Sequence, residues 1–213
     1  MTLLVSEIFK SIQGESTHSG RICAFVRLSE CNLACSWCDT RYAWTQGRVM
    51  ALNAIVKQVL AFKTRLIEVT GGEPLLQAGT LPLLRRLLKE KKKILLETNG
   101  SLSLAGVPKG VHIIMDIKTP SSGVVIPYLP ANLSWLKPSD EIKFVVADNK
   151  DLAFSGKFIR RHGLDKKHTV LLSPVAGRLS LARVAAWCLK SGLNVRLNVQ
   201  LHKILWPKQT RGV

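Results

Sequence analysis

Apolar residues along this chain recur with two periods, one typical of strands and one typical of helices. Short apolar runs predict strands at residues 3–9, 22–28, 66–69, 94–97, 111–117, 141–146, 170–172 and 195–199. Apolar residues at helical spacing predict helices over about 51–62, 81–88, 151–162 and 180–191. Strands that alternate with helices in this way indicate βαβ units and a mainly parallel sheet.

The predicted elements favour an α/β fold. Several strands are near-continuous apolar runs, as expected where both faces of a parallel sheet are covered. With about six or seven units and no G-x-G-x-x-G motif, we expect an incomplete (β/α) barrel, in a single domain over residues 1–213. Sites in such folds lie at the carboxyl ends of the strands. The residues at these ends are Cys31, Gly71, Asn99, Lys118 and Ser173.

Three of the five cysteines fall in one loop, where Cys31, Cys35 and Cys38 are spaced C-x3-C-x2-C. Three neighbouring thiolates cannot all pair as disulfides, but they can converge on one centre. Thiolate is the ligand of iron–sulfur clusters, and a four-iron cubane held by three cysteines keeps one iron open to an outside ligand. An open iron beside a bound reactant indicates a chemical site rather than an electron relay.

A zinc site is the alternative. Structural zinc takes four protein ligands, often from two separated pairs. The other two cysteines, Cys23 and Cys188, stand alone, so Asp39 or His18 would have to complete the set. Three unrelated core cysteines would have no reason to gather in a polar loop. We therefore favour a cluster-binding loop over residues 30–40.

The bulk composition is that of a globular protein, with 213 residues of which 46% are apolar. The sequence contains no uninterrupted run of 18 apolar residues, so we expect no membrane span. Its start lacks the charged head and cleavage site of a signal peptide. An odd and clustered set of cysteines then favours the reducing cytoplasm.

The formal net charge of +17 allows two interpretations. It could attract nucleic acid, or it could attract anionic small molecules and an acidic electron donor such as a flavodoxin. Outside residues 89–93, which look like the solvated end of a helix, the basic residues are scattered, and no RNA-binding motif appears. We do not expect direct nucleic-acid binding.

Single charged and polar residues near the strand ends each allow two roles. Arg27 lies inside an apolar strand, so it needs a structural partner such as Glu30 or a substrate carboxylate that its guanidinium can grip. Asp116 could cap its loop while Lys118 reaches solvent, or both could line a pocket. Thr40 could be an ordinary loop hydroxyl, or could bind Mg²⁺ with help from substrate or water.

The cysteine loop resembles the signature of the radical S-adenosylmethionine (SAM) superfamily, C-x3-C-x-aromatic-C, with Trp37 in the aromatic place. Residues 70–74, Thr-Gly-Gly-Glu-Pro, could be a plain tight turn after a strand, but they match the superfamily's GGEP motif. The resemblance implies a 4Fe–4S cluster whose open iron binds SAM. It also implies that reduction of the cluster cleaves SAM to a 5′-deoxyadenosyl radical.

A longer series of motifs extends over essentially the full chain. The matching segments are residues 9–16, Gly20, 25–28, 31–40, 70–74, 97–100, 116–122, 198–203 and 211–213. In this order they resemble the 7-carboxy-7-deazaguanine synthase family. The resemblance implies a lyase that converts 6-carboxy-5,6,7,8-tetrahydropterin to 7-carboxy-7-deazaguanine with loss of ammonia, in the biosynthesis of queuosine, a tRNA modification, and of other 7-deazapurines. It further implies Mg²⁺ as a cofactor and a homodimer.

The same resemblance assigns roles to individual residues. Cys31, Cys35 and Cys38 would hold the cluster, and Thr40 would bind Mg²⁺. The implied SAM contacts are Trp37, Cys38, Asp39, Gly72, Glu73, Lys118, Ser173, Pro174, Val175 and Ala176. The implied substrate contacts are Ile12, Gln13, Gly14, Glu15, Arg27 and Thr70. A tail over about residues 200–213 would close over the substrate.

Two other functions stay open. An activating enzyme of glycyl-radical enzymes shares the cysteine spacing and the small size, but it acts on a protein and would not need Gln13 and Glu15 together with Arg27. A metal-bearing RNA-binding module would use the positive charge instead. Turnover of the carboxytetrahydropterin and metal analysis would separate the three.

Overall fold

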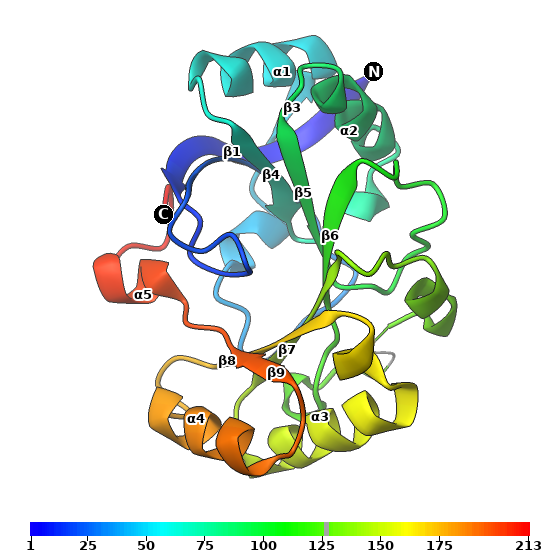
Figure 1. Ribbon diagram of the computed structural model, residues 1–213. Coiled ribbons are helices and arrows are strands. Elements are labelled where there is room, and N and C mark those ends of the chain that lie inside the picture. The colour runs from blue at the N-terminus through cyan, green and yellow to red at the C-terminus, as the bar shows by residue number, and fades with distance from the viewer. Residues whose placement is uncertain (126–127) are drawn as a thin grey trace.

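The computed structural model describes residues 1–125 and 128–213. Within these residues, nine strands form one sheet in the order β3-β1-β2-β4-β5-β6-β7-β8-β9 (Figure 1). The strands are β1 (Thr2–Ile12), β2 (Ile22–Leu28), β3 (Arg48–Ala51), β4 (Leu66–Gly71), β5 (Lys93–Thr98), β6 (Val111–Asp116), β7 (Glu141–Val146), β8 (Thr169–Pro174) and β9 (Val195–Leu197). The sheet does not close on itself, because β3 and β9 remain its two edges.

From β2 through β9, neighbouring strands of this order are parallel, whereas β1 is antiparallel to both β2 and β3. The expected α/β fold, an incomplete and mainly parallel barrel, is therefore confirmed. The sequence did not predict β3, which is short, largely exposed and held by pairing with β1. The first predicted strand ended too early, at residue 9. The polar residues Lys10 and Ser11 continue β1, because pairing with β2 keeps them extended.

Five α-helices connect or follow the strands: α1 (Leu52–Ala61), α2 (Thr80–Leu88), α3 (Asn149–His162), α4 (Leu181–Lys190) and α5 (Leu201–Leu205), counted over the described residues. The four predicted helices match α1 to α4 to within two residues at each end. Asp148 begins α3 by accepting a hydrogen bond from the Asp151 amide, and Gly163 ends it in the left-handed conformation. None of the helices in the described part of the chain has the length and apolar character of a membrane span.

Short 3-10 helices fill several of the remaining connections: η1 (Arg41–Trp44), η2 (Pro74–Leu76), η3 (Pro120–Ser122), η4 (Pro130–Ser134) and η5 (Leu164–Lys166). Between the cysteine loop and β3, where every residue is described, the one helical element is the short turn η1.

The helices cover the outer face of the curved sheet in two groups, α1 with α2 on one half and α3 with α4 on the other (Figure 1). The first core contains Val26, Ile55, Val59, Ile67, Leu84 and Leu96. The second contains Met115, Ile142, Phe144, Ile159, Leu172 and Val184. Burial of these side chains drives the sheet to curve with its other face turned inward.

The inner face changes from apolar to charged toward the carboxyl ends of the strands. Because side chains alternate along a strand, β2 presents Phe25 and then Arg27 inward, and β5 presents Leu95 and then Glu97. Phe25 and Leu95 belong to a small apolar cluster with Cys23, Leu66 and Ile114. This cluster forms the floor above which the charged side chains gather.

We expect Phe144→Ala to lower the free energy of unfolding by about 3–5 kcal/mol, because it empties a fully buried site between β7 and α3. Urea unfolding followed by circular dichroism measures the change. Leu189→Ala is the control, since Leu189 is 88% exposed and should change stability by less than about 0.5 kcal/mol. Equal effects of the two substitutions would contradict the assigned core.

Candidate active site

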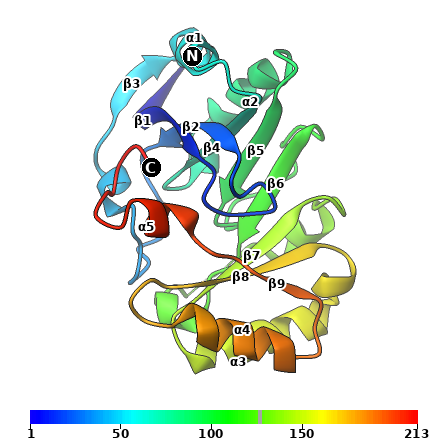
Figure 2. The same cartoon turned by 60° about the vertical axis from the view of Figure 1, so that its left-hand side comes forward.

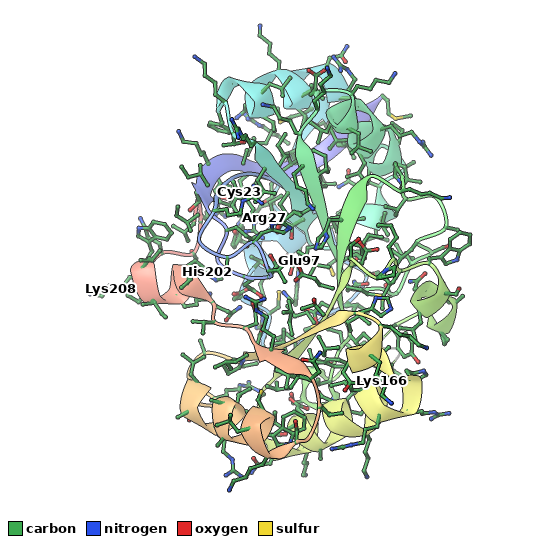
Figure 3. The ribbon with its side chains drawn as sticks, viewed as in Figure 1. Cys23, Arg27, Glu97, Lys166, His202 and Lys208 are labelled. Carbon is green, nitrogen blue, oxygen red and sulfur yellow. The ribbon has the colours of Figure 1, made fainter. Side chains whose placement is uncertain are left out.

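One cavity of about 540 Å³ lies at the carboxyl ends of the strands. Arg27 and Glu97 lie in the middle of the molecule, His202 lies on α5, and Lys208 lies at the margin (Figure 3). Most of the residues that the sequence singled out line this cavity: Ile12, Gln13, Gly14, Glu15, Arg27, Cys31, Cys35, Trp37, Cys38, Asp39, Thr40, Thr70, Gly72, Lys118, Val175 and Ala176. The fold therefore brings together segments that are far apart in the sequence.

Three predicted SAM contacts do not line the cavity. The carboxylate of Glu73 is fully buried and accepts hydrogen bonds from Leu75 N (2.9 Å), Thr98 Oγ1 (2.9 Å) and Asn99 N (2.7 Å). Ser173 is also fully buried, and Asn198 Nδ2 lies 2.7 Å from its hydroxyl oxygen. Glu73, like Ser173 and its neighbour Pro174, supports the wall of the cavity from behind.

The three cysteines of the loop are free thiols that share this cavity. Burial raises the pKa of Cys31 and Cys35, so both hold their protons until a metal centre displaces them. The loop is fixed by backbone hydrogen bonds from Cys38 N to Cys35 O (3.2 Å) and from Ser36 N to Ser122 O (3.0 Å). This donor set suits a cluster held by three sulfurs.

Glycines at the end of β4 allow the cysteine loop to lie against the next strand. A Cβ on Gly71, whose φ is +144°, would stand 2.1 Å from Leu28 O, and a Cβ on Gly72 would stand 1.9 Å from Glu30 O. The family resemblance implies that Gly72 contacts SAM. The structure shows that Gly71 and Gly72 also let two backbone segments approach each other closely.

Arg27 has a structural partner, but it is Glu7 and not Glu30. Arg27 Nε donates to Glu7 Oε1 over 2.8 Å across the β1–β2 pair, and Tyr42 donates to the same oxygen over 2.7 Å. Glu30 is exposed and adopts a positive φ of 70° that turns it away. Within the described residues, the two Nη groups of Arg27 have no hydrogen-bond acceptor. A ligand carboxylate in the cavity could take both.

Four charged side chains form a network across the inner face, and the sequence had assigned no site role to Glu97 or Lys143. Lys143 is 4% exposed and donates to Glu15 Oε2 (3.0 Å) and to Glu97, while Asp116 Oδ2 lies 3.9 Å away. Burial raises the pKa of Glu97, but the charge and hydrogen bond of Lys143, together with the Thr70 hydrogen bond and the charge of Arg27, outweigh this effect and lower the pKa to about 2. The carboxylates in turn hold the pKa of Lys143 well above its usual value.

Asp116 and Lys118 both line the cavity, so Lys118 does not simply reach solvent. They pair at 2.8 Å, and Lys118 Nζ lies 5.2 Å from the centre of the Trp37 ring. Asp116 Oδ1 is buried without a hydrogen-bond partner, and it is the one such side-chain atom in the part of the chain that the structure describes. A buried acceptor of this kind indicates that a ligand completes the site.

The C-terminal tail crosses the mouth of the cavity from β9 toward β1 (Figure 2). Leu201 N donates to Gly14 O (2.9 Å), Gln200 Nε2 donates to Glu15 Oε1 (2.8 Å), and Gly212 N donates to Glu7 Oε2 (3.1 Å). His202, Lys203, Gln209, Thr210 and Val213 line the cavity. The family resemblance implied that this tail closes over the substrate, but it assigned no individual contact within the tail, because relatives vary there.

Asp39 and His18, the two residues that could have completed a zinc site, both have other partners. The side chain of Asp39 is 47% exposed and pairs with Lys203 at 2.8 Å. Partial desolvation opposes ionisation, but the charge and hydrogen bond of Lys203 lower the pKa of the Asp39 carboxyl. His18 lies at the amino ends of β6 and β7, where its ring packs edge-on against His112, and Glu141 binds His112 and Thr17. His18, His112 and Glu141 together anchor the loop of residues 13–20, and they are separate from the cysteines.

Thr40 lies beside the cysteines, with Oγ1 3.6 Å from Cys38 Sγ and 3.5 Å from Asp39 Oδ1. Its hydroxyl lines the cavity and has no strong protein partner among the described residues. It is therefore placed to take an additional oxygen-bound ligand, as the Mg²⁺ interpretation requires.

Comparison with known proteins agrees with this geometry. A family model described as the radical SAM superfamily matches residues 26–122. The chain is 45% identical to the 7-carboxy-7-deazaguanine synthase of Chlorobaculum tepidum, over 99% of this chain and 97% of the relative. It is 41% identical to that of Koribacter versatilis, over 98% of this chain and 99% of the relative. The solved structure of QueE from Escherichia coli shares the fold, with a TM-score of 0.78, 21% identity and 94% of both chains covered.

We expect Gly72→Ala to displace the cysteine loop, because the added Cβ would overlap Glu30 O. After anaerobic reconstitution, the iron content per chain should fall by more than half. Gly177→Ala is the matched control: its φ is +77° with no atom within 4 Å of the added Cβ, so it should cost about 1–2 kcal/mol of stability and leave iron binding intact. Full iron content in Gly72→Ala would show that the close contact is dispensable.

Proposed function

This chain belongs to the 7-carboxy-7-deazaguanine synthase family, and we propose that it is a radical SAM lyase that converts 6-carboxy-5,6,7,8-tetrahydropterin to 7-carboxy-7-deazaguanine with loss of ammonia. The observation that carries the proposal is one cavity in which three free cysteines meet Arg27 and a network of buried charges. A product of this kind supplies the biosynthesis of queuosine and of other 7-deazapurines.

Cys31, Cys35 and Cys38 fit three irons of a 4Fe–4S cluster and would leave the fourth iron to SAM. When bound, the cluster and SAM supply the one-electron chemistry that generates the radical. The residues proposed to hold SAM are Trp37, Cys38, Asp39, Gly72, Lys118, Val175 and Ala176, with Glu73, Ser173 and Pro174 behind them. The free Oδ1 of Asp116 offers an acceptor to an amino or hydroxyl group of a bound ligand.

The pterin would occupy the side of the cavity formed by β1, β2 and β4. Arg27 is held through Nε by Glu7, so its two Nη groups can bind the substrate carboxylate. Gln13 and Glu15 offer donors and acceptors to the edge of the planar ring, and Ile12, Gly14 and Thr70 line the same wall. The tail, held to Gly14 and Glu15, would keep water from the reacting carbon.

Lys143 has an electrostatic rather than an acid–base role in this proposal. Its raised pKa keeps it charged near neutral pH, so it is a poor proton donor. Instead it holds Glu15 and Glu97 in place within the cavity. These two carboxylates then face the pterin in fixed orientations, as proximity catalysis requires.

We further propose that Thr40 would help to hold Mg²⁺ through its hydroxyl oxygen, and that the ion would balance charge on the substrate carboxylate. A single hydroxyl binds Mg²⁺ weakly, so the ion would need substrate and water oxygens to complete its octahedral shell. The electron would come from an acidic donor such as a flavodoxin, which suits a chain of net charge +17. A homodimer in the cytoplasm completes the proposal.

Anaerobic turnover with the carboxytetrahydropterin, SAM and a reductant tests the function. We expect formation of 7-carboxy-7-deazaguanine, detected by mass and absorbance, with one ammonia released per product. Cys35→Ala should abolish turnover. Arg27→Lys should raise KM about 10- to 100-fold, because a point charge replaces two parallel hydrogen bonds. An intact cluster that cleaves SAM without forming the deazaguanine would refute the proposal.

A second test addresses the metal. Thr40→Val should weaken the dependence of kcat/KM on Mg²⁺ and lower the rate at saturating Mg²⁺ about 10-fold or more, because it removes the one protein oxygen proposed to bind the ion. Thr45→Val, at an exposed position outside the cavity, should behave like the unsubstituted chain. Equal Mg²⁺ dependence in both variants would place the ion elsewhere.

A further inference from the structure

An acidic residue stands in the apolar floor of the cavity. Glu68 is 3% exposed and lies on the inner face of β4, where its register partners are Phe25 of β2 and Leu95 of β5. Both partners belong to the apolar cluster beneath the cavity. Burial of a carboxyl among such residues is costly, so its presence needs a reason other than packing.

Among the described residues, the side-chain carboxyl of Glu68 has one hydrogen-bond partner, the carboxamide of Gln13. Gln13 Nε2 donates to Glu68 Oε2, and Gln13 Oε1 accepts from Glu15 N over 3.0 Å. Both ends of the Gln13 carboxamide are therefore hydrogen-bonded. Because Glu68 accepts from Nε2, it fixes the orientation in which Nε2 faces Glu68 and Oε1 faces Glu15 N. Because the orientation of Gln13 also sets the backbone at Glu15, Glu68 controls two of the proposed substrate contacts.

The charged or titratable groups around Glu68 come from four elements. Cys23 and Arg27 face it from β2, Glu15 from the loop after β1, Glu97 from β5 and Lys143 from β7. Neither cation is hydrogen-bonded to Glu68: Arg27 Nε binds Glu7, and Lys143 binds Glu15 and Glu97, so their charges act on Glu68 only from a distance.

Burial, and then the charge of Glu97, raise the pKa of Glu68 well above its usual value, although the more distant charges of Lys143 and Arg27 act in the opposite direction. In the neutral acid, one oxygen accepts from Gln13 while the O–H remains to donate. Glu68 lines the cavity, so that donor has access to a ligand.

We propose that Glu68 works as an uncharged carboxylic acid that orients Gln13 and presents its own O–H to an acceptor atom on the edge of the planar substrate. This inference rests on the proposed function. It makes Glu68 a specificity-determining residue: a ring that carries an acceptor at that position gains a hydrogen bond, and one that carries a donor there meets a second donor.

Two substitutions separate the neutral-acid role from a role of the carboxylate. Glu68→Gln keeps an oxygen for Gln13 and an N–H for the substrate, so it should retain kcat/KM to within about 3-fold. Glu68→Leu removes both groups and should lower kcat/KM about 10- to 100-fold, mainly through KM. It should also increase the SAM cleaved per product formed, because the substrate is held less well. If Glu68→Gln lost as much activity as Glu68→Leu, or if Glu68→Leu kept its KM, the proposal would be wrong.

A measurement on the folded protein without substrate tests the charge state independently. A raised pKa means that the folded state binds the Glu68 proton more tightly than the unfolded state does. The stability of the unsubstituted chain must therefore fall, relative to Glu68→Gln, as pH rises above the unfolded value of about 4.3 toward the folded one. The difference in Tm between Glu68→Gln and the unsubstituted chain should grow from pH 5 to pH 8.

Glu90→Gln, a substitution outside the cavity, is the control and should show a flat difference over the same range. A flat difference for Glu68→Gln would show that Glu68 is ionised and would overturn the proposal. If the unsubstituted chain failed to turn over the pterin at all, the proposed function would fall, while the stability comparison would still report the state of Glu68.

Discussion

The site depends on a close backbone contact between residues 28–30, at the end of β2, and residues 71–73, at the end of β4. Hydrogen bonds of 3.1 and 2.8 Å join the two segments, and no side chain fits between them. Because Cys31 follows this contact directly, the contact fixes where the cysteine loop begins. The buried carboxylate of Glu73 then ties the same turn to Asn99 at the end of β5, so three adjacent strand ends form one rigid wall.

That rigid wall can support a charge network that would otherwise be unfavourable. Lys143 is removed from water, and its desolvation cost is offset only because carboxylates hold it from two sides. Loss of one partner would leave a buried charge with incomplete compensation. The network therefore constrains β5, β7 and the loop carrying Glu15 relative to one another, and it converts packing on the outer face into precise placement on the inner face.

The sequence predicted what depends on local pattern and missed what depends on contacts between distant segments. Eight of the nine strands, the four longer helices and the cysteine loop follow from spacing alone. The partner of Arg27 does not: Glu30 is close in sequence, but Glu7 faces Arg27 through the antiparallel pairing of β1 with β2. Lys143 and Glu97, like Arg27, are charged residues inside apolar strands. Only the curved arrangement of the strands shows that all three face one cavity.

The arrangement also explains where the excess positive charge lies. The chain has 14 acidic residues against 31 Lys and Arg. Several of the acidic residues are used in or beside the cavity, namely Glu7, Glu15, Asp39, Glu97 and Asp116. Acidic groups are thus concentrated inside, and the outer surface is left basic. A basic exterior attracts an anionic substrate from a distance, whereas the carboxylates within suit the cationic sulfonium and amino groups of SAM. The net charge can therefore serve small-molecule chemistry without implying a nucleic-acid partner.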